Sequence, residues 1–186
     1  MRLSTGECHL KLRKIVSGGQ SGAGRTALEC ARERGLETGG WATKGYRVDG
    51  GTDPSLAGFG LVETGTSDYR ARTHLNTRDS DITVWFGKTS PGYWCTLKGC
   101  SLYNKEFRVN PTPEQFRELT DEYEVINVAG NRARINPEVV GLVKAAFAGL
   151  GRTNEEKVQF VADILDRALA AMRRAEDESG LDAESI

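Results

Sequence analysis

The chain has 186 residues, of which 38% are hydrophobic and 27% are charged, and its formal net charge is −1. This composition is typical of a globular protein and excludes the disordered, collagen-like and membrane-spanning classes. The last twelve residues hold five acids and no base, so residues 1–174 contain 25 basic and 21 acidic residues, an excess too small for an extended nucleic-acid interface.

Short strands alternating with helices are predicted along the chain, which indicates the α/β class. Residues 12–17 are typical of a first strand. Residues 25–34 carry apolar side chains at helical spacing and end before Gly35, so they predict a helix. The glycine-rich stretch 38–60 is longer than the usual connection in a compact domain and predicts an irregular loop that contacts a ligand.

The middle of the chain continues the alternation. Residues 61–64 predict a short strand, and Ser67 is placed to cap a helix that runs to about residue 77. The apolar and β-branched run 82–86 is of the kind that is buried in a parallel sheet. Residues 106–109 predict the following strand.

A strong helix start follows this strand. Thr112, Pro113 and Gln115 provide an N-cap, a proline at the first helical position and a capping-box partner for a helix to residue 119. Residues 125–129 predict a return to the sheet.

Two further helices are predicted near the end of the chain. Asn136 and Pro137 open one that reaches residue 147, and a capping box of Thr153 and Glu156 opens a last one that reaches about residue 174. We therefore expect an N-terminal extension over residues 1–11, a single domain over residues 12–174 that includes the last helix, and an acidic tail over residues 175–186.

The loop 18–24, GGQSGAG, stands between the first predicted strand and the first predicted helix. Bare backbone N–H groups in such a turn, next to the positive end of a helix, form an anion site. A tight turn without a ligand is the alternative, but the four glycines in this loop exceed what turning alone requires.

Two common nucleotide-binding motifs fit this loop poorly. Residues 19–26 read GxxxxGRT, a near match to the Walker A pattern with Arg25 in place of the lysine. A planar guanidinium is not equivalent to the lysine ammonium, so the P-loop NTPase class is disfavoured. The GxGxxG pattern is absent as well, which disfavours ordinary NAD binding.

Cysteines and histidines are too few and too scattered for a tetrahedral zinc site, so we expect no metal ligated directly by the protein and free thiols at Cys8, Cys30, Cys95 and Cys100. The chain begins without the apolar segment of a secretory signal. It also has no apolar stretch long enough to span a membrane. We therefore expect a cytoplasmic protein that binds neither membrane nor nucleic acid.

Four sequence blocks occur in order between residues 14 and 147: IVSGGQSGAGRTALE, GGWATKGYRVDG, SDYRARTHLNTRDSDITVWF and INVAGNR. Together they resemble the molybdenum carrier family, also described as molybdenum cofactor carriers, which is related to Rossmann-like nucleotide-binding proteins. The resemblance implies a Rossmann-like α/β three-layer sandwich with a mostly parallel sheet, kinship with the lysine-decarboxylase-like phosphoribohydrolases, and homo-oligomers.

The resemblance also implies which residues form a phosphate and cofactor site. The first block matches the family's phosphate loop at Gly18, Gly19, Gln20, Ser21, Gly22 and Arg25, with Gly24 where the family often has aspartate. The second and third blocks match at Gly40, Trp41, Lys44, Gly45, Tyr69, Arg72, Thr73, Asn76, Asp79, Ser80 and Asp81. The fourth matches at Asn127, Gly130, Asn131 and Arg132. Arg70 and Arg72 lie on different faces of a predicted helix, and the matched block favours Arg72 for the site.

The related hydrolases use a PGGxGTxxE loop, whose glutamate acts on the ribosyl bond. The corresponding residues 91–99 read PGYWCTLKG, so Gly92 and Thr96 remain candidate ligand contacts, whereas Gly99, beside Lys98, replaces the glutamate. A lysine ammonium cannot replace a carboxylate beside an oxocarbenium-like centre, so binding without turnover is favoured.

Several side chains have two interpretations. Asp79 and Asp81 either supply a catalytic carboxylate from another element or end a helix and form a turn. Tyr93 and Trp94 either stack against a flat ring or pack in the core. Cys95 is either a reactive thiol or an inert core residue.

We therefore expect a carrier or sequestering protein for a phosphate-bearing heterocycle, either a nucleotide derivative or the molybdenum cofactor (molybdopterin). The amides of residues 18–24 and Arg25 would hold the phosphate, Lys44 and Arg72 would add charge, and Trp41 or Trp94 would cover the ring. Two alternatives stay open: an N-glycosidic phosphoribohydrolase acting on nucleotide monophosphates, and a protein-interaction module built on an empty nucleotide fold.

Overall fold

Six parallel strands form the central sheet of the computed structural model, which describes residues 10–150, 165 and 169. The strands are β1 (Lys14–Val16), β2 (Glu37–Ala42), β5 (Leu61–Glu63), β6 (Ile82–Phe86), β7 (Glu106–Val109) and β8 (Val125–Gly130). Their order is β5-β2-β1-β8-β6-β7, and each neighbouring pair is parallel. Strand β6 is buried along its whole length, as its apolar sequence predicts.

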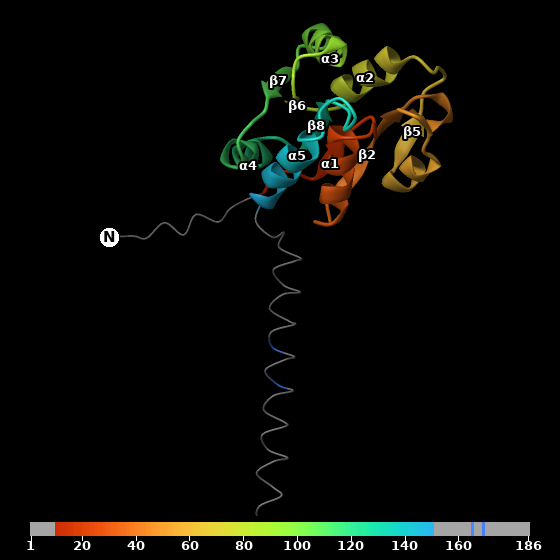
Figure 1. Cartoon of the computed structure of the whole chain (residues 1–186). Helices are drawn as coiled ribbons and strands as arrows, with labels where there is room; N and C mark the ends of the chain where they lie inside the picture. Colours follow the sequence, from red (N-terminus) through yellow and green to blue (C-terminus); the bar gives the residue numbers. More distant parts are fainter. Residues whose placement is uncertain (1–9, 151–164, 166–168, 170–186) are drawn as a thin grey trace, which may run out of the picture. The chain divides into compact units, whose positions relative to one another are not determined.

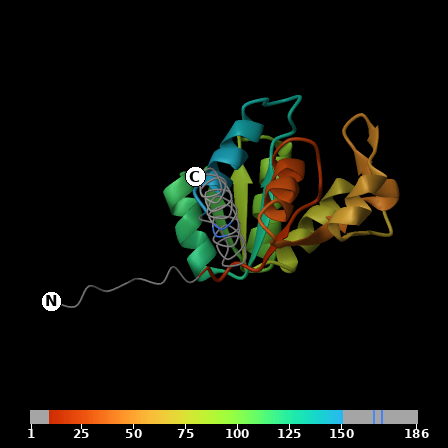
Figure 2. The same cartoon turned by 90° about the horizontal axis from the view of Figure 1, so that it is seen from below.

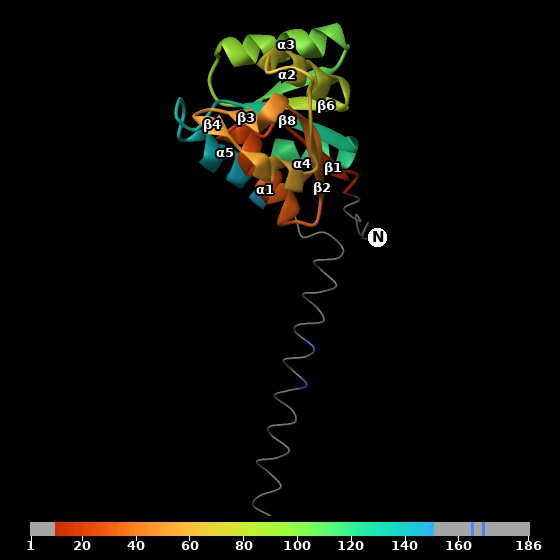
Figure 3. The same cartoon turned by 90° about the vertical axis from the view of Figure 1, so that its right-hand side faces the viewer.

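Helices cover both faces of this sheet (Figures 1 and 3). On one face lie α1 (Ala23–Arg32), α4 (Pro113–Glu122) and α5 (Val139–Ala148), and on the other lie α2 (Tyr69–Arg78) and α3 (Pro91–Leu102). The core between the sheet and the first group contains Phe86, Phe116 and Phe147, all fully buried. The predicted Rossmann-like three-layer α/β sandwich is confirmed.

The winding of the chain places the ends of β1 and β8 at a reversal point. The chain passes from β1 to β2 and β5 on one side, crosses to β6 and β7 on the other, and returns with β8 between β1 and β6. In open parallel sheets, ligands bind outside the carboxyl ends of the strands at such a point. The fold therefore indicates a site where residues 17–18 and 127–130 meet.

The predicted irregular loop over residues 38–60 is wrong at its start, because β2 occupies residues 37–42. One of the glycines that suggested a loop serves a close approach instead: Gly40 has φ +127, and a Cβ at this position would clash with the main chain of Ser17 and with Asn76 Oδ1. The remainder forms the 3₁₀ turns η1 (Lys44–Tyr46) and η2 (Pro54–Phe59) and the hairpin strands β3 (Arg47–Val48) and β4 (Gly51–Thr52). Figure 2 shows this orange segment to one side of the sheet.

Helix starts differ from the prediction by a few residues. Asp68, rather than Ser67, caps α2, since its side chain accepts the amide of Arg70. The capping box of Thr112 and Gln115 is confirmed, and α4 continues to Glu122. Helix α5 starts at Val139, later than predicted.

The structure separates residues 1–151 from residues 152–186 as two units. In the second unit Leu165 and Leu169 are described, and both are helical. The rest of the predicted last helix, the acidic tail and Cys8 lie outside the described residues. Across the part of the chain that is described, no helix is both long and apolar enough to cross a bilayer.

Candidate functional site

A cavity of about 360 Å³ opens at the carboxyl ends of β1 and β8, between the first turns of α2 and α3. This volume is within the range of small-molecule sites. Among the site residues assigned from the sequence, those that line it are Gly18, Gln20, Gly24, Tyr69, Arg72, Thr73, Asn76, Gly92, Thr96, Asn127, Gly130 and Arg132. We call this space the Arg72 cavity.

Backbone amides of the loop before α1 divide into two sets. Ser21 N donates to Gln20 Oε1 at 3.1 Å, Ala23 N to Asn131 O at 3.2 Å and Arg25 N to Gln20 O at 3.0 Å. The intervening amides of Gly18, Gln20, Gly22 and Gly24 donate to no acceptor among the described residues. Gly18 and Gly24 belong to the cavity wall, so this wall retains unpaired donors next to the start of a helix.

Arg72 supplies the positive charge that is closest to this wall. Its guanidinium lies against Gly18, where a Cβ would overlap it. Within the described part of the chain the guanidinium makes no hydrogen bond and no ion pair. Burial lowers the pKa of Arg72 to about 10, so the side chain remains charged at neutral pH. A half-buried cation without a counterion is a strong indication of an anion site.

Two more arginines border the cavity, Arg70 and Arg132. Arg70 Nε is 3.1 Å from Asp68, whereas Arg132 is 3.1 Å from an Asp49 carboxylate that also binds Arg134. The hydrogen bond from Arg134 is the main cause of the lowered pKa of Asp49. None of the described residues that line the cavity is a carboxylate, so its wall is cationic.

Amide side chains shape the rest of the wall. Gln20 is buried; its Oε1 accepts the amide of Asp49 at 2.7 Å, while its Nε2 has no partner among the described residues. A buried donor without an acceptor is costly unless a ligand or water pairs with it. Asn76 pairs with the main chain of Trp41: its Oδ1 accepts the Trp41 amide at 2.7 Å and its Nδ2 donates to the Trp41 carbonyl at 3.0 Å. Asn76 thus joins α2 to β2.

Other predicted site residues lie outside the cavity. Arg25 binds Asp53 at 2.7 Å, Glu29 at 2.8 Å and Ser55 at 2.9 Å, so its guanidinium holds the 44–60 segment against α1. Lys44 is exposed on η1. The residues Gly19, Ser21, Gly22, Trp41 and Asn131 do not line the cavity either.

Some of these residues have visible structural roles. Gly22 has φ +91 and abuts the main chain of residues 131–133. The Asn131 side chain accepts the Lys88 amide at 2.6 Å and donates to the Lys88 carbonyl at 3.1 Å, which fastens the loops after β6 and β8 to each other.

The two candidate catalytic carboxylates are both engaged elsewhere. Asp79 accepts Trp41 Nε1 at 2.7 Å and pairs with Arg78, whose hydrogen bond is the main cause of its lowered pKa. Asp81 Oδ2 accepts the amides of Glu124 and Val125 at 3.1 and 2.8 Å. Asp81 directly precedes β6, at the amino end of the sheet and hence opposite the cavity.

Helix α3, which the sequence did not predict as a helix, brings aromatic side chains near the cavity. Ser90 caps it and Pro91 occupies its first turn. Tyr93 packs edge-on against Trp85 and Phe107, whereas Trp94 is 60% exposed. Trp94 borders a second cavity of about 490 Å³, together with His74 and Lys98, and this Trp94 cavity shares Arg70 and Cys95 with the Arg72 cavity.

Cys95 lies in the wall between these two cavities, and its Sγ is 4.0 Å from His74 Nε2. Burial raises the pKa of the Cys95 thiol, which keeps it protonated at neutral pH. The three described cysteines, Cys30, Cys95 and Cys100, are free thiols. Among the residues that the structure describes there is also no cluster of three or more histidine, cysteine or carboxylate side chains able to hold a metal.

Comparison with known proteins identifies the family to which the chain belongs. Residues 15–150 match the family model described as the circularly permutated YpsA SLOG family, cpYpsA. The chain belongs to this family. The crystal structure of a putative molybdenum carrier protein from Syntrophus aciditrophicus is similar to this cpYpsA chain, with 31% sequence identity and a TM-score of 0.67. The match covers 75% of this chain and 94% of that one.

The resemblance to molybdenum carriers is therefore confirmed for the cpYpsA chain. No match was found among curated proteins. Sequence reasoning did not assign Ser17, Arg70, Pro91, Val128 and Ala129 to the site, although all five line the Arg72 cavity. Their common signal is position, since most of them directly follow or end a strand, or begin a helix, at the carboxyl edge of the sheet.

Proposed function

We propose that this protein binds a phosphate-bearing heterocycle, a nucleotide derivative or the molybdenum cofactor, and carries or sequesters it. The observation that supports this proposal is Arg72, a cation in the cavity wall without a counterion among the described residues. A phosphate beside it would gain charge-assisted hydrogen bonds from the guanidinium and from the free amides of Gly18 and Gly24.

The residues present suit the phosphate of either ligand. The unpaired Gln20 Nε2 is an additional donor near the cavity. Oxyanions accept hydrogen bonds and donate few, so a wall of N–H donors without a carboxylate is the expected complement. These donors would bind and orient the phosphate, while the chemistry of a molybdenum centre, where one is carried, would belong to the cofactor.

The flat ring of the ligand has a natural place in the Trp94 cavity. Trp94 exposes its indole there, and the shared wall of Arg70 and Cys95 makes this cavity adjacent to the Arg72 cavity. Aromatic faces stack on purines and on pterins alike, because stacking does not depend on the hydrogen-bonding pattern of the ring. Trp41 is less suited to this role, because its Nε1 is bound to Asp79 and its ring does not border the Arg72 cavity.

Binding without turnover is favoured over glycosidic hydrolysis. Hydrolysis of an N-glycosidic bond requires a carboxylate near the sugar, or an equivalent group that manages the proton and the developing positive charge. Asp79 and Asp81 are bound to other partners, and Gly99 packs against His74 and Thr77. The phosphoribohydrolase alternative would therefore need a catalytic group outside the described cavity wall.

Native mass spectrometry of the protein purified from its own source tests the proposal directly. We expect a bound small molecule whose mass includes a phosphate and a heterocycle, and the same spectra report whether the chain forms the homo-oligomers that the family resemblance implies. Incubation with nucleoside monophosphates, followed by chromatography, tests the alternative: release of free base at a rate proportional to enzyme concentration would favour the hydrolase. If no small ligand co-purifies or raises the melting temperature, a protein-interaction module is the better interpretation.

A further inference from the structure

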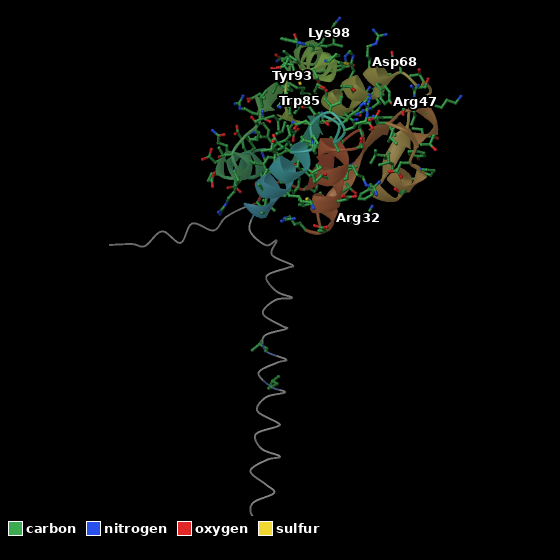
Figure 4. All side chains as sticks on the ribbon, viewed as in Figure 1. Arg32, Arg47, Asp68, Trp85, Tyr93 and Lys98 are labelled. Carbon is green, nitrogen blue, oxygen red and sulfur yellow. The ribbon has the colours of Figure 1, made fainter. Side chains whose placement is uncertain are left out.

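Three guanidinium groups surround the ring of Tyr69, the first residue of α2. The guanidinium carbons of Arg47, Arg72 and Arg132 lie 5.4, 5.6 and 5.3 Å from its centroid. They come from β3, from α2 and from the loop after β8, so three separate elements bring positive charge to one point. Figure 4 shows Arg47 on the same side of the molecule as Asp68, where α2 begins, and Arg32 on the far end of α1.

Tyr69 separates the Arg72 cavity from a further cavity of about 510 Å³ at the β3–β4 hairpin. This hairpin cavity is lined by Arg47, Asp49, Thr52 and the hairpin glycines, and Tyr69 and Arg132 border both spaces. The two cavities are therefore neighbours: Arg132 is common to both, Arg47 belongs to the hairpin cavity, and Arg70 and Arg72 belong to the Arg72 cavity.

The positive charge at this junction exceeds the negative charge. Asp49 is the carboxylate in the hairpin cavity wall, and it already binds both Arg132 and Arg134. The Arg47 guanidinium, like that of Arg72, makes no hydrogen bond or ion pair with any described residue. Like charges that are held close together repel each other unless an anion lies between them.

A single phosphate leaves part of this charge unmatched. An anion placed against Gly18 and Arg72 lies on one side of Tyr69, whereas Arg47 opens on the hairpin cavity on the other side. Because Tyr69 and Arg132 border both cavities, the two spaces adjoin, and a ligand with two linked anionic groups can place one group in each.

We infer that the ligand carries a diphosphate, with one phosphate in the Arg72 cavity and the other between Arg47 and Arg132 in the hairpin cavity. This inference rests on the proposed function and narrows it. It favours a nucleotide-type ligand with a diphosphate bridge over a pterin that carries a single phosphate. Arg132, which borders both cavities, contacts both phosphates.

Isothermal titration calorimetry of the full chain with inorganic orthophosphate and inorganic pyrophosphate tests the inference. We expect pyrophosphate to bind about 10-fold or more tightly than orthophosphate, since it gains charge-assisted hydrogen bonds from a second arginine. Arg47→Gln removes a guanidinium from an exposed hairpin position and is expected to bring the ratio of the two affinities close to one. Arg13→Gln is the matched control: it deletes the same charge before β1, at the amino edge of the sheet, and keeps the wild-type ratio.

Two results overturn the inference while leaving the proposed function standing: wild-type protein binds both anions with equal affinity, or Arg47→Gln retains the wild-type ratio. The proposed function fails separately if neither anion binds, or if Arg72→Gln binds orthophosphate as tightly as the wild type. A wild-type circular dichroism spectrum and a cooperative melting transition above the assay temperature establish for each variant that a loss of binding does not arise from unfolding.

Discussion

Arg72 illustrates how a binding residue can oppose folding. Its guanidinium sits against Gly18, with a pKa lowered to about 10 chiefly by burial. A basic group whose pKa is lower in the folded state binds its proton less tightly there than in the unfolded chain. The charge of Arg72 therefore opposes folding at every pH below about 10, and this cost is relieved only as the pH rises above that value.

Replacing Arg72 by an uncharged residue should have opposite effects on the stability of the fold and on anion binding. We expect Arg72→Met, which keeps most of the side-chain volume, to raise the free energy of unfolding of the ligand-free protein by about 1–2 kcal/mol at pH 7, because it removes a half-buried charge without a partner. The same variant should lose orthophosphate binding. Urea denaturation and calorimetry measure the two effects, and a variant that is less stable yet binds normally would contradict both.

A substitution at Gly18 tests whether the anion binds in the Arg72 cavity by changing the shape of the cavity and leaving its charge unchanged. A Cβ at this position would overlap the Arg72 guanidinium, which is the end of a flexible side chain and can move away. We expect Gly18→Ala to fold normally but to bind orthophosphate about 10-fold more weakly, since Arg72 is displaced and an amide is shielded.

The control for this variant is Gly58→Ala, where no heavy atom lies within 4 Å of the added Cβ. It should change neither stability nor affinity measurably. Equal phosphate affinity in Gly18→Ala and wild-type protein would place the bound anion away from Gly18.

At the scale of elements, the sequence predicted the sheet better than its connections. The apolar run of β6 and the capping box of α4 were recognised because burial and capping leave local patterns. Strand β2 was missed because Gly40 is required by its close contact with Ser17 and Asn76, residues that are distant in sequence. Helix α3 was obscured by Gly92 and Gly99, and the second of these packs against Thr77 of α2.

For the site too, the sequence revealed local patterns but not contacts between residues that are distant in sequence. The glycine loop after the first strand is a local signal, and its residues Gly18, Gln20 and Gly24 do line the Arg72 cavity. The position of Arg25 at the start of α1 suggested a phosphate contact, but its direction depends on Asp53 and Ser55, which only the folded 44–60 segment brings near. No local pattern could have shown that these partners take its guanidinium.

A substitution at Arg25 therefore tests how the segment 44–60 is held against α1. It joins α1 to the segment 44–60 through Asp53 and Ser55, and lies 4.6 Å from the Phe59 ring. We expect Arg25→Ala to lower the free energy of unfolding by about 1 kcal/mol, as partly exposed ion pairs of this kind contribute little more. Hydrogen exchange in residues 44–60 should become faster, while orthophosphate affinity stays within about 2-fold of the wild type. A tenfold loss of affinity would instead return Arg25 to the binding site.

For the whole molecule, the parallel sheet and the cationic site have a joint consequence for stability. The cavity wall combines residues at the ends of β1 and β8, in the middle of the sheet, with residues from the first turns of α2 and α3, which cover one face of that sheet. An anion bound there contacts elements that separate on unfolding, so its binding free energy adds to the stability of the entire fold.

This linkage predicts a dependence on the identity of the salt. At equal ionic strength, the ligand-free protein should unfold at a higher temperature in sodium phosphate than in sodium chloride, since phosphate occupies the site and chloride screens it without forming the same hydrogen bonds. Phosphate at one hundred times its dissociation constant should add about 2.7 kcal/mol to the free energy of unfolding. Phosphate also strengthens apolar burial in any protein, so the specific effect is the difference between wild type and Arg72→Met. If this variant gains as much from phosphate as the wild type does, the stabilisation arises from the solvent and the site makes no contribution to it.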